Sequence, residues 1–193
     1  TFLMEALIGS TLAVALAEIG DKTQLLALLL ISRYHRPYAI AAGILVATLI
    51  NHALSALLGS WLADLIPAQW VPWILASSFL IVALWTLIPD KASDEPGRFH
   101  QYGPFVATLV LFFLAEIGDK TQVATVVLAA KFDAFLMVVI GTTVGMLLAN
   151  IPVLFAGRWL MDKIPLKYAR ISAFMLFVIL AVVTLIHTNG QVH

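Results

Sequence analysis

The chain has 193 residues, of which 62% are hydrophobic and 11% are charged, and its mean hydropathy is +1.00. This composition excludes a soluble globular domain and predicts an all-α polytopic membrane protein. Acidic and basic residues balance at 11 each, so the charge indicates no nucleic-acid partner, and the absence of cysteine excludes disulfides and thiolate metal sites.

Six apolar segments follow one another along the chain, and each reaches the ~20 residues that a helix needs to cross the bilayer. The alternating pattern of a membrane barrel is absent. We expect the first segment to be a retained span rather than a cleaved signal. The first and fourth segments are longer than required and should tilt, bend or break at Gly20 and Gly118, and Pro152 predicts a kink in the fifth. The segments cover residues 2–31, 37–62, 70–89, 104–130, 134–160 and 170–187.

The second half of the chain repeats the first at an offset of 98 residues. Glu18–Gln24 returns letter for letter as Glu116–Gln122, and the Gly, Trp, Asp and Pro of 59–67 recur in 157–165. Each copy contains three predicted spans, an odd number, so the second copy should be inverted relative to the first. The sequence therefore predicts six transmembrane helices arranged as two inverted three-helix repeats. The predicted parts are a first repeat at 1–90, a cytoplasmic linker at 91–103 and a second, inverted repeat at 104–193.

Basic residues in the connections gather on one side of the predicted membrane. The other side has Lys131 alone. Because positively charged loops stay in the cytoplasm, we expect the linker to be cytoplasmic and both termini to be outside. The eight basic residues on the predicted cytoplasmic side are Arg33, Arg36, Lys91, Arg98, Arg158, Lys163, Lys167 and Arg170.

The repeated motif Glu-Ile-Gly-Asp-Lys-Thr-Gln puts charged residues in the middle of an apolar span, where each costs about 2.5–3.5 kcal/mol on insertion. On a continuous helix, Glu18, Asp21 and Lys22 would share one face. One motif offers too few oxygens for a hard divalent cation, but two facing motifs suffice for Ca²⁺ or Mn²⁺, between which these residues do not decide. We predict one shared metal site made of Glu18, Asp21, Glu116, Asp119, Thr23, Thr121, Gln24 and Gln122.

Other polar residues in the spans are expected to support this site. Lys22 and Lys120 would limit repulsion among the acids when no ion is bound. Asn51, His52 and Asn150 would surround the site, bind the ion directly, or form hydrogen bonds between helices. A purely structural ion pair is the simpler interpretation of the motif. It does not explain why Gly, Thr and Gln are repeated with the charges.

Three functions are compatible with such a site. The first is a secondary transporter, and the alternative is a passive divalent-cation channel, which would favour a ring of acids from several subunits. The third is a membrane-embedded metalloenzyme. No His-x-x-x-His or similar metal-ligand spacing occurs in the chain, so we expect that the protein is not an enzyme.

The doubled motif, on the first and fourth of six spans, resembles that of the Gdt-type cation/proton exchanger family. This family includes Golgi and chloroplast manganese/calcium transporters and bacterial manganese exporters. The resemblance covers essentially the whole chain. It implies export of Mn²⁺, or of Ca²⁺, in exchange for protons, with Glu18, Asp21, Glu116 and Asp119 as the metal and proton site. The compact length favours a manganese exporter of the bacterial inner membrane, with no permanently bound cofactor and with the metal ion, protons and lipid bilayer as partners.

Overall fold

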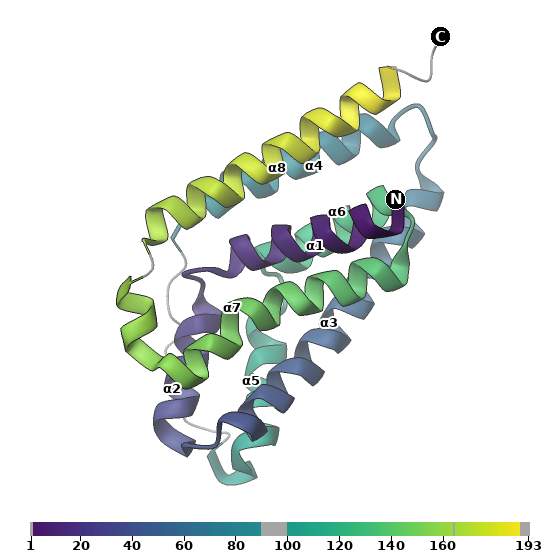
Figure 1. Ribbon diagram of the computed structural model, residues 1–193. Coiled ribbons are helices and arrows are strands. Elements are labelled where there is room, and N and C mark those ends of the chain that lie inside the picture. The colour runs from purple at the N-terminus through teal and green to yellow at the C-terminus, as the bar shows by residue number, and fades with distance from the viewer. Residues whose placement is uncertain (1, 90–99, 164, 190–193) are drawn as a thin grey trace.

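The computed structural model describes residues 2–89, 100–163 and 165–189, and these residues are helical apart from short connections, with no strand among them (Figure 1). The predicted all-α class is confirmed. The elements are α1 (Phe2–Glu18), α2 (Lys22–Tyr34), α3 (Pro37–Leu65), α4 (Val71–Thr86), the short 3-10 helix η1 (His100–Tyr102), α5 (Gly103–Glu116), α6 (Lys120–Phe132), α7 (Phe135–Lys163) and α8 (Leu166–Asn189).

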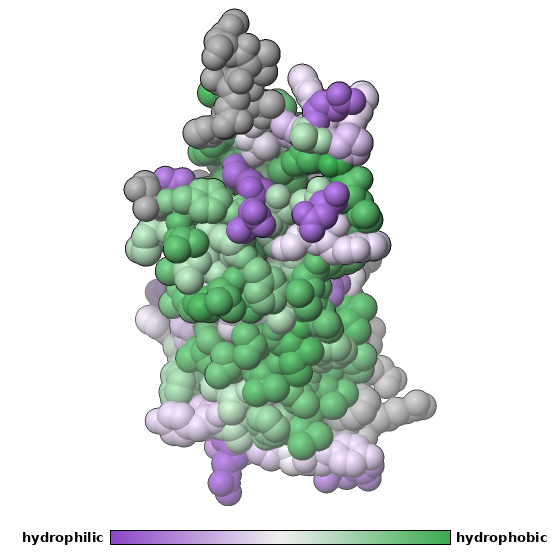
Figure 2. Space-filling model, turned by 90° about the vertical axis from the view of Figure 1, so that its right-hand side faces the viewer, coloured by the Kyte–Doolittle hydropathy of each residue, from purple (hydrophilic) through white to green (hydrophobic). Residues whose placement is uncertain are grey.

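Several described helices have the length and apolar character of membrane spans. Three of the described helices are long and apolar enough to cross a membrane: α3, α7 up to Gly157, and α8 up to Ile186. Helices α1 and α2 also pass this test when they are taken together as one broken span. Helices α4 and α5 are apolar but shorter. Figure 2 shows a broad hydrophobic area on one face, bounded at both ends by hydrophilic side chains. The fold is therefore that of a helical membrane protein, while the number of six spans stays a prediction.

The first and fourth predicted segments both break at the repeated motif. Helix α1 ends at Glu18 and α2 begins at Lys22, with a bend of 70° between them. Gly20 has φ +80° and Gly118 has φ +73°, a region that favours glycine because it has no Cβ. The expectation that Glu18, Asp21 and Lys22 share one face of a continuous helix is therefore wrong. Asp21 instead forms the N-cap of α2, next to the partial positive charge of that helix end.

Helix α7 departs from helical geometry at a glycine beyond Pro152. Pro152 is inside the helix, and the residue with non-helical angles is Gly157, at φ 58° and ψ −145°. A Cβ at Gly157 would meet no atom within 4 Å, so conformation rather than space favours glycine there. The kink predicted at Pro152 stays a prediction, because a proline can bend a helix while the angles around it remain helical.

The two halves of the chain pack across each other. Helix α3 lies on α5, where a Cβ at Gly43 would be 2.9 Å from Phe105 O. Helix α7 lies on α1, where a Cβ at Gly141 would be 2.6 Å from Leu7 O. Gly141 is the counterpart of Gly43, and Phe105 is the counterpart of Leu7, because the members of each pair are separated by the 98-residue offset. The sequence repeat is thus also a repeat of packing, with each half supplying the helix on which the other rests.

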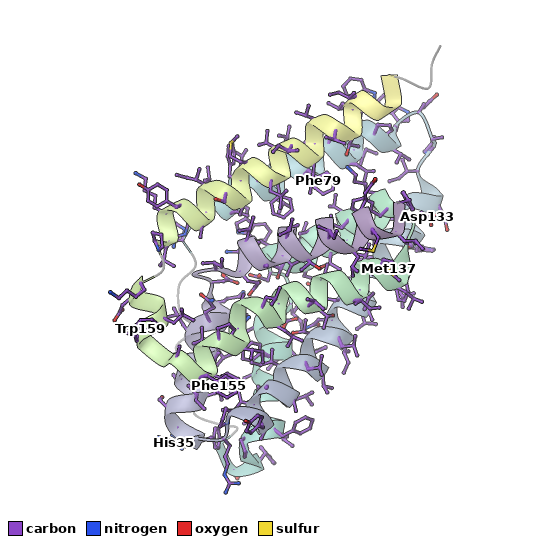
Figure 3. The ribbon with its side chains drawn as sticks, viewed as in Figure 1. His35, Phe79, Asp133, Met137, Phe155 and Trp159 are labelled. Carbon is purple, nitrogen blue, oxygen red and sulfur yellow. The ribbon has the colours of Figure 1, made fainter. Side chains whose placement is uncertain are left out.

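Connections alternate between two ends of the molecule. His35, between α2 and α3, and Trp159 near the end of α7 lie toward one end, and Asp133, between α6 and α7, lies at the other (Figure 3). Helices α4 and α8 run side by side, and α4 also contacts α6 while α8 contacts α1. Of the predicted linker, residues 91–99 lie outside the described residues, and residues 100–103 form η1 and the first residue of α5.

Candidate cation site

The two broken-helix motifs meet in the interior of the protein. Lys120 Nζ lies 3.1 Å from Asp21 Oδ1, and Lys22 Nζ lies 2.9 Å from Asp119 Oδ1. Each motif's lysine therefore pairs with the aspartate of the other motif, and we call these two contacts the crossed ion pairs. All four motif carboxylates, those of Glu18, Asp21, Glu116 and Asp119, are buried.

Three of the acids lie close enough to share a cation. Glu18, Asp21 and Asp119 each offer a carboxylate oxygen, and these oxygens lie within 4.8 Å of one another. Glu116 is not part of this group. Two carboxylates thus come from the first break and one from the second, so the geometry combines both halves of the chain around a small volume rich in oxygen, which is the ligand type that hard divalent cations take.

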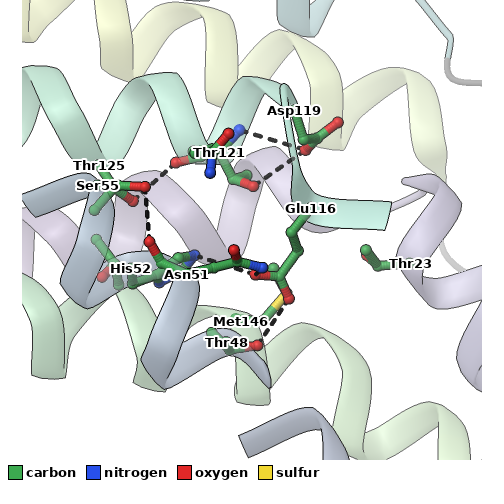
Figure 4. Close-up of polar contacts among 12 residues, drawn as sticks. Thr23, Thr48, Asn51, His52, Ser55, Glu116, Asp119, Thr121, Thr125 and Met146 are labelled. Carbon is green, nitrogen blue, oxygen red and sulfur yellow. Dashed lines mark hydrogen bonds and ion pairs between the residues drawn. The ribbon is translucent and has the colours of Figure 1, made fainter. Parts of the chain in front are cut away.

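Glu116 is held by side chains of α3 (Figure 4). Its Oε1 accepts a hydrogen bond from Thr48 Oγ1 at 2.9 Å, and its Oε2 accepts one from Asn51 Nδ2 at 3.1 Å. His52 Nε2 lies 4.0 Å from the same Oε2. Asn51 and His52 were predicted to support the site, and both lie beside a motif acid. Thr48 was missed, although its position one helical turn before His52 puts it on the same face of α3.

Glu18 has fewer partners. Thr23 Oγ1 donates a hydrogen bond to its Oε2, whereas its Oε1 is buried and has no hydrogen-bond partner within the described part of the chain. Asn150, on α7, donates from Nδ2 to Met146 O at 3.1 Å and to Met146 Sδ at 3.0 Å. Its Oδ1 is likewise buried without a partner among the described residues.

The motif glutamines stabilise the two breaks. The Gly20 N–H donates to Gln24 Oε1 at 2.7 Å, and the Gly118 N–H donates to Gln122 Oε1 at 2.6 Å. Gln24 Nε2 also donates to Ala149 O at 2.7 Å, which ties the first break to α7. These hydrogen bonds satisfy amide groups that lose their helical partners where the helix stops, so each glutamine oxygen holds the backbone of its own break.

The second motif threonine also bonds an acid. Thr121 donates to Asp119 Oδ2 from its Oγ1 at 3.1 Å and from its backbone N–H at 3.4 Å, and this fixes Asp119 as the N-cap of α6. The first motif differs, since Asp21 has no such cap bond and Thr23 turns to Glu18. The two threonines, like the glutamines, orient the charged groups in this structure.

Buried acids paired with lysines within membrane-length segments mark an ion pathway. The helical membrane fold and these groups together define the class as a membrane cation transporter. The comparisons agree: the chain belongs to the family described as "Divalent cation/proton antiporter GDT1", which it matches twice, over residues 6–94 and 104–191. It is a transporter and not an enzyme, and the family resemblance is confirmed.

Curated relatives span nearly the whole chain. A Vibrio cholerae protein named "Putative manganese exporter" is 52% identical over 182 residues, which cover 94% of this chain and 90% of that protein. The Synechocystis "GDT1-like protein sll0615" is 26% identical, covering 94% and 97% of the two chains. The Arabidopsis thaliana "GDT1-like protein 5" is 29% identical, covering 89% and 91%. No solved structure matches this chain.

Proposed function

We propose that this protein exports Mn²⁺ across a bacterial inner membrane in exchange for protons, through one site that the two motifs share. The observation that carries the proposal is the pair of crossed ion pairs, Asp21 with Lys120 and Asp119 with Lys22. These contacts join the two motifs, so an event at one motif acts on the other half of the chain.

The site can bind a cation by exchange of partners. A divalent ion among Glu18, Asp21 and Asp119 draws both aspartates away from their lysines, because two positive charges attract a carboxylate more strongly than one. The ion then replaces the crossed ion pairs as the link between the halves, and this exchange of partners can shift one half against the other. Protons returning to the acids release the ion on the other side. Glu116 belongs to the proposed site as the fourth acid, next to the three-acid group rather than within it.

The proposed architecture has six spans in two inverted three-helix repeats, 1–90 and 104–193, with the linker 91–103 in the cytoplasm and both termini outside. Three observations support it. The family matches each half separately, the packing at Gly43 recurs at Gly141 by the same offset, and the basic residues gather in connections of one side. Broken helices that meet at a central site are typical of transporters built from inverted repeats.

Manganese is the proposed main substrate, with Ca²⁺ as a second. The acids suit either ion, since both accept oxygen ligands. The name of the 52% identical Vibrio cholerae relative favours manganese.

Flux into proteoliposomes under an imposed pH gradient tests the exchange. We expect wild-type protein to accumulate Mn²⁺ against its concentration gradient when protons flow the opposite way, and Asp21→Asn to abolish this. Asp64→Asn is the matched control, because Asp64 is an exposed acid near the end of α3. Metal flux that runs only downhill, whatever the pH gradient, would contradict the proposal and favour the passive channel.

A further inference from the structure

Glu18 and Glu116 occupy the same position in the repeated motif, but the helices beside them carry different side chains. Helix α7 lies beside Glu18, and α3 lies beside Glu116. Helix α7 packs on α1 in the register in which α3 packs on α5, and this register continues at Gly145, where a Cβ would lie 2.9 Å from Ala15 N. One turn further along, residues 146–150 of α7 reach the level of Glu18. The hydrogen bond from Gln24 Nε2 to Ala149 O independently fixes this turn of α7 against the first motif.

Helix α7 lacks the hydrogen-bond donors that α3 supplies. Thr48 and Asn51 bond Glu116, and their counterparts at the 98-residue offset are Met146 and Ala149, which have no side-chain N–H or O–H. This difference explains why one oxygen of Glu18 is buried without a hydrogen bond.

The side-chain oxygen of Asn150 on α7 also lacks a hydrogen-bond partner among the described residues. Asn150 takes the position that His52 has in the other half, and it turns its Nδ2 back to Met146. Its Oδ1 therefore stays buried without a partner in the described residues, as does Glu18 Oε1. Met146 is fully buried and appears in the close-up of the polar residues around Glu116 (Figure 4). Buried lone pairs need a donor or a cation, and no donor of the described residues reaches Glu18 Oε1 or Asn150 Oδ1.

We propose that Asn150 Oδ1 and Met146 Sδ are ligands of the transported ion beside Glu18, and that the thioether makes the site prefer Mn²⁺ to Ca²⁺. The inference rests on the proposed function for the identity of the ion as cargo. Ca²⁺ is a hard cation that takes oxygen ligands, whereas a thioether is a soft ligand that transition metals accept more readily. The carboxylates bind either ion, so the selectivity for Mn²⁺ over Ca²⁺ comes from the single sulfur among the oxygen ligands.

Met146→Leu tests the assignment, because leucine keeps the apolar bulk and removes the sulfur. Mn²⁺ and Ca²⁺ uptake are compared in proteoliposomes under one pH gradient. We expect the preference for Mn²⁺ over Ca²⁺ to fall by about tenfold, mainly through a higher KM for Mn²⁺. The matched control is Met137→Leu on the same helix, toward the opposite end (Figure 3), which should keep the wild-type ratio. An unchanged ratio in a folded, active Met146→Leu protein overturns the proposal.

A second measurement does not depend on transport. X-ray absorption of Cd²⁺ bound to the purified protein detects sulfur ligands directly, and since the chain has no cysteine, any Cd–S contact comes from methionine. We expect this contact in wild type and Met137→Leu and its loss in Met146→Leu. A wild-type shell of oxygen and nitrogen alone overturns the proposal. A Met146-dependent Cd–S contact in a protein that moves no metal would support the ligand assignment and contradict the proposed function.

Discussion

Lys120 Nζ lies 3.1 Å from Asp21 Oδ1, and this contact joins the second broken helix to the first inside the protein. Its counterpart, Lys22 with Asp119, is less enclosed: the side chain of Lys22 is 23% exposed and that of Lys120 is 5% exposed. The crossed ion pairs are therefore chemically alike but differ in access. In this conformation, Lys22 is therefore more accessible than Lys120 to an ion that would displace a lysine from its aspartate.

The Asp21–Lys120 pair should show strong coupling in stability. Removing one member breaks a buried ion pair, which costs about 3–5 kcal/mol. We expect Asp21→Asn and Lys120→Gln each to lower the unfolding temperature in detergent clearly, and the double variant to be more stable than the sum of the two losses predicts. Purely additive losses would mean that the two residues do not interact.

The hydrogen bonds of α3 to Glu116 should matter for transport. Thr48→Val removes a donor to a buried carboxylate, and an unsatisfied buried acceptor costs about 1–3 kcal/mol. We expect folded protein with reduced Mn²⁺ flux. The control is Ser55→Ala on the same helix, whose hydroxyl donates to Asn51 O at 2.7 Å (Figure 4). Equal flux in the two variants would show that the Thr48 contact is dispensable.

The two break glycines should differ in their tolerance of alanine. Both have positive φ, where an L-residue costs about 1–2 kcal/mol. At Gly20 a Cβ would also lie 2.7 Å from Leu166 Cδ2, whereas at Gly118 it would meet nothing within 4 Å. Gly20→Ala should therefore lower the unfolding temperature more than Gly118→Ala. The double variant Gly20→Ala/Leu166→Ala should recover part of the difference, and no recovery would exclude crowding as its cause.

The proposed orientation can be tested because the chain has no cysteine. Arg36 and Gln69 are exposed and lie just beyond opposite ends of α3. In intact cells, an impermeant thiol reagent added outside should label Gln69→Cys and not Arg36→Cys, and permeabilised cells should allow both. Labelling of Arg36→Cys from outside would reverse the assignment.

The sequence predicted much of this site because the information was local. Gly20 and Gly118 lie in segments too long for one span, and both helices break there. The choice of partner was not predictable, because Lys22 is one residue from Asp21 in the chain and yet pairs with Asp119. That choice follows from the packing of α3 on α5 and of α7 on α1, which the offset alone does not reveal. Met146 was missed because a methionine in an apolar span looks like ordinary core.

The crossed ion pairs also lead to a prediction about net charge. Each aspartate is paired with a lysine, so two carboxylates, Glu18 and Glu116, remain to be neutralised. One divalent cation neutralises them, and so do two protons. Because uncompensated charge at the centre of a bilayer is costly, the site should change its accessibility only when neutral.

We therefore expect exchange of one metal ion for two protons, driven by a pH gradient and not by membrane potential. Proteoliposomes clamped with potassium and valinomycin at equal pH should accumulate no Mn²⁺ at either polarity. The same vesicles with an imposed pH gradient and zero potential should accumulate it, which confirms that the protein is active. Uphill uptake driven by potential alone would mean that each cycle moves net charge. In that case one lysine loses its charge during transport, and the count of two protons is wrong.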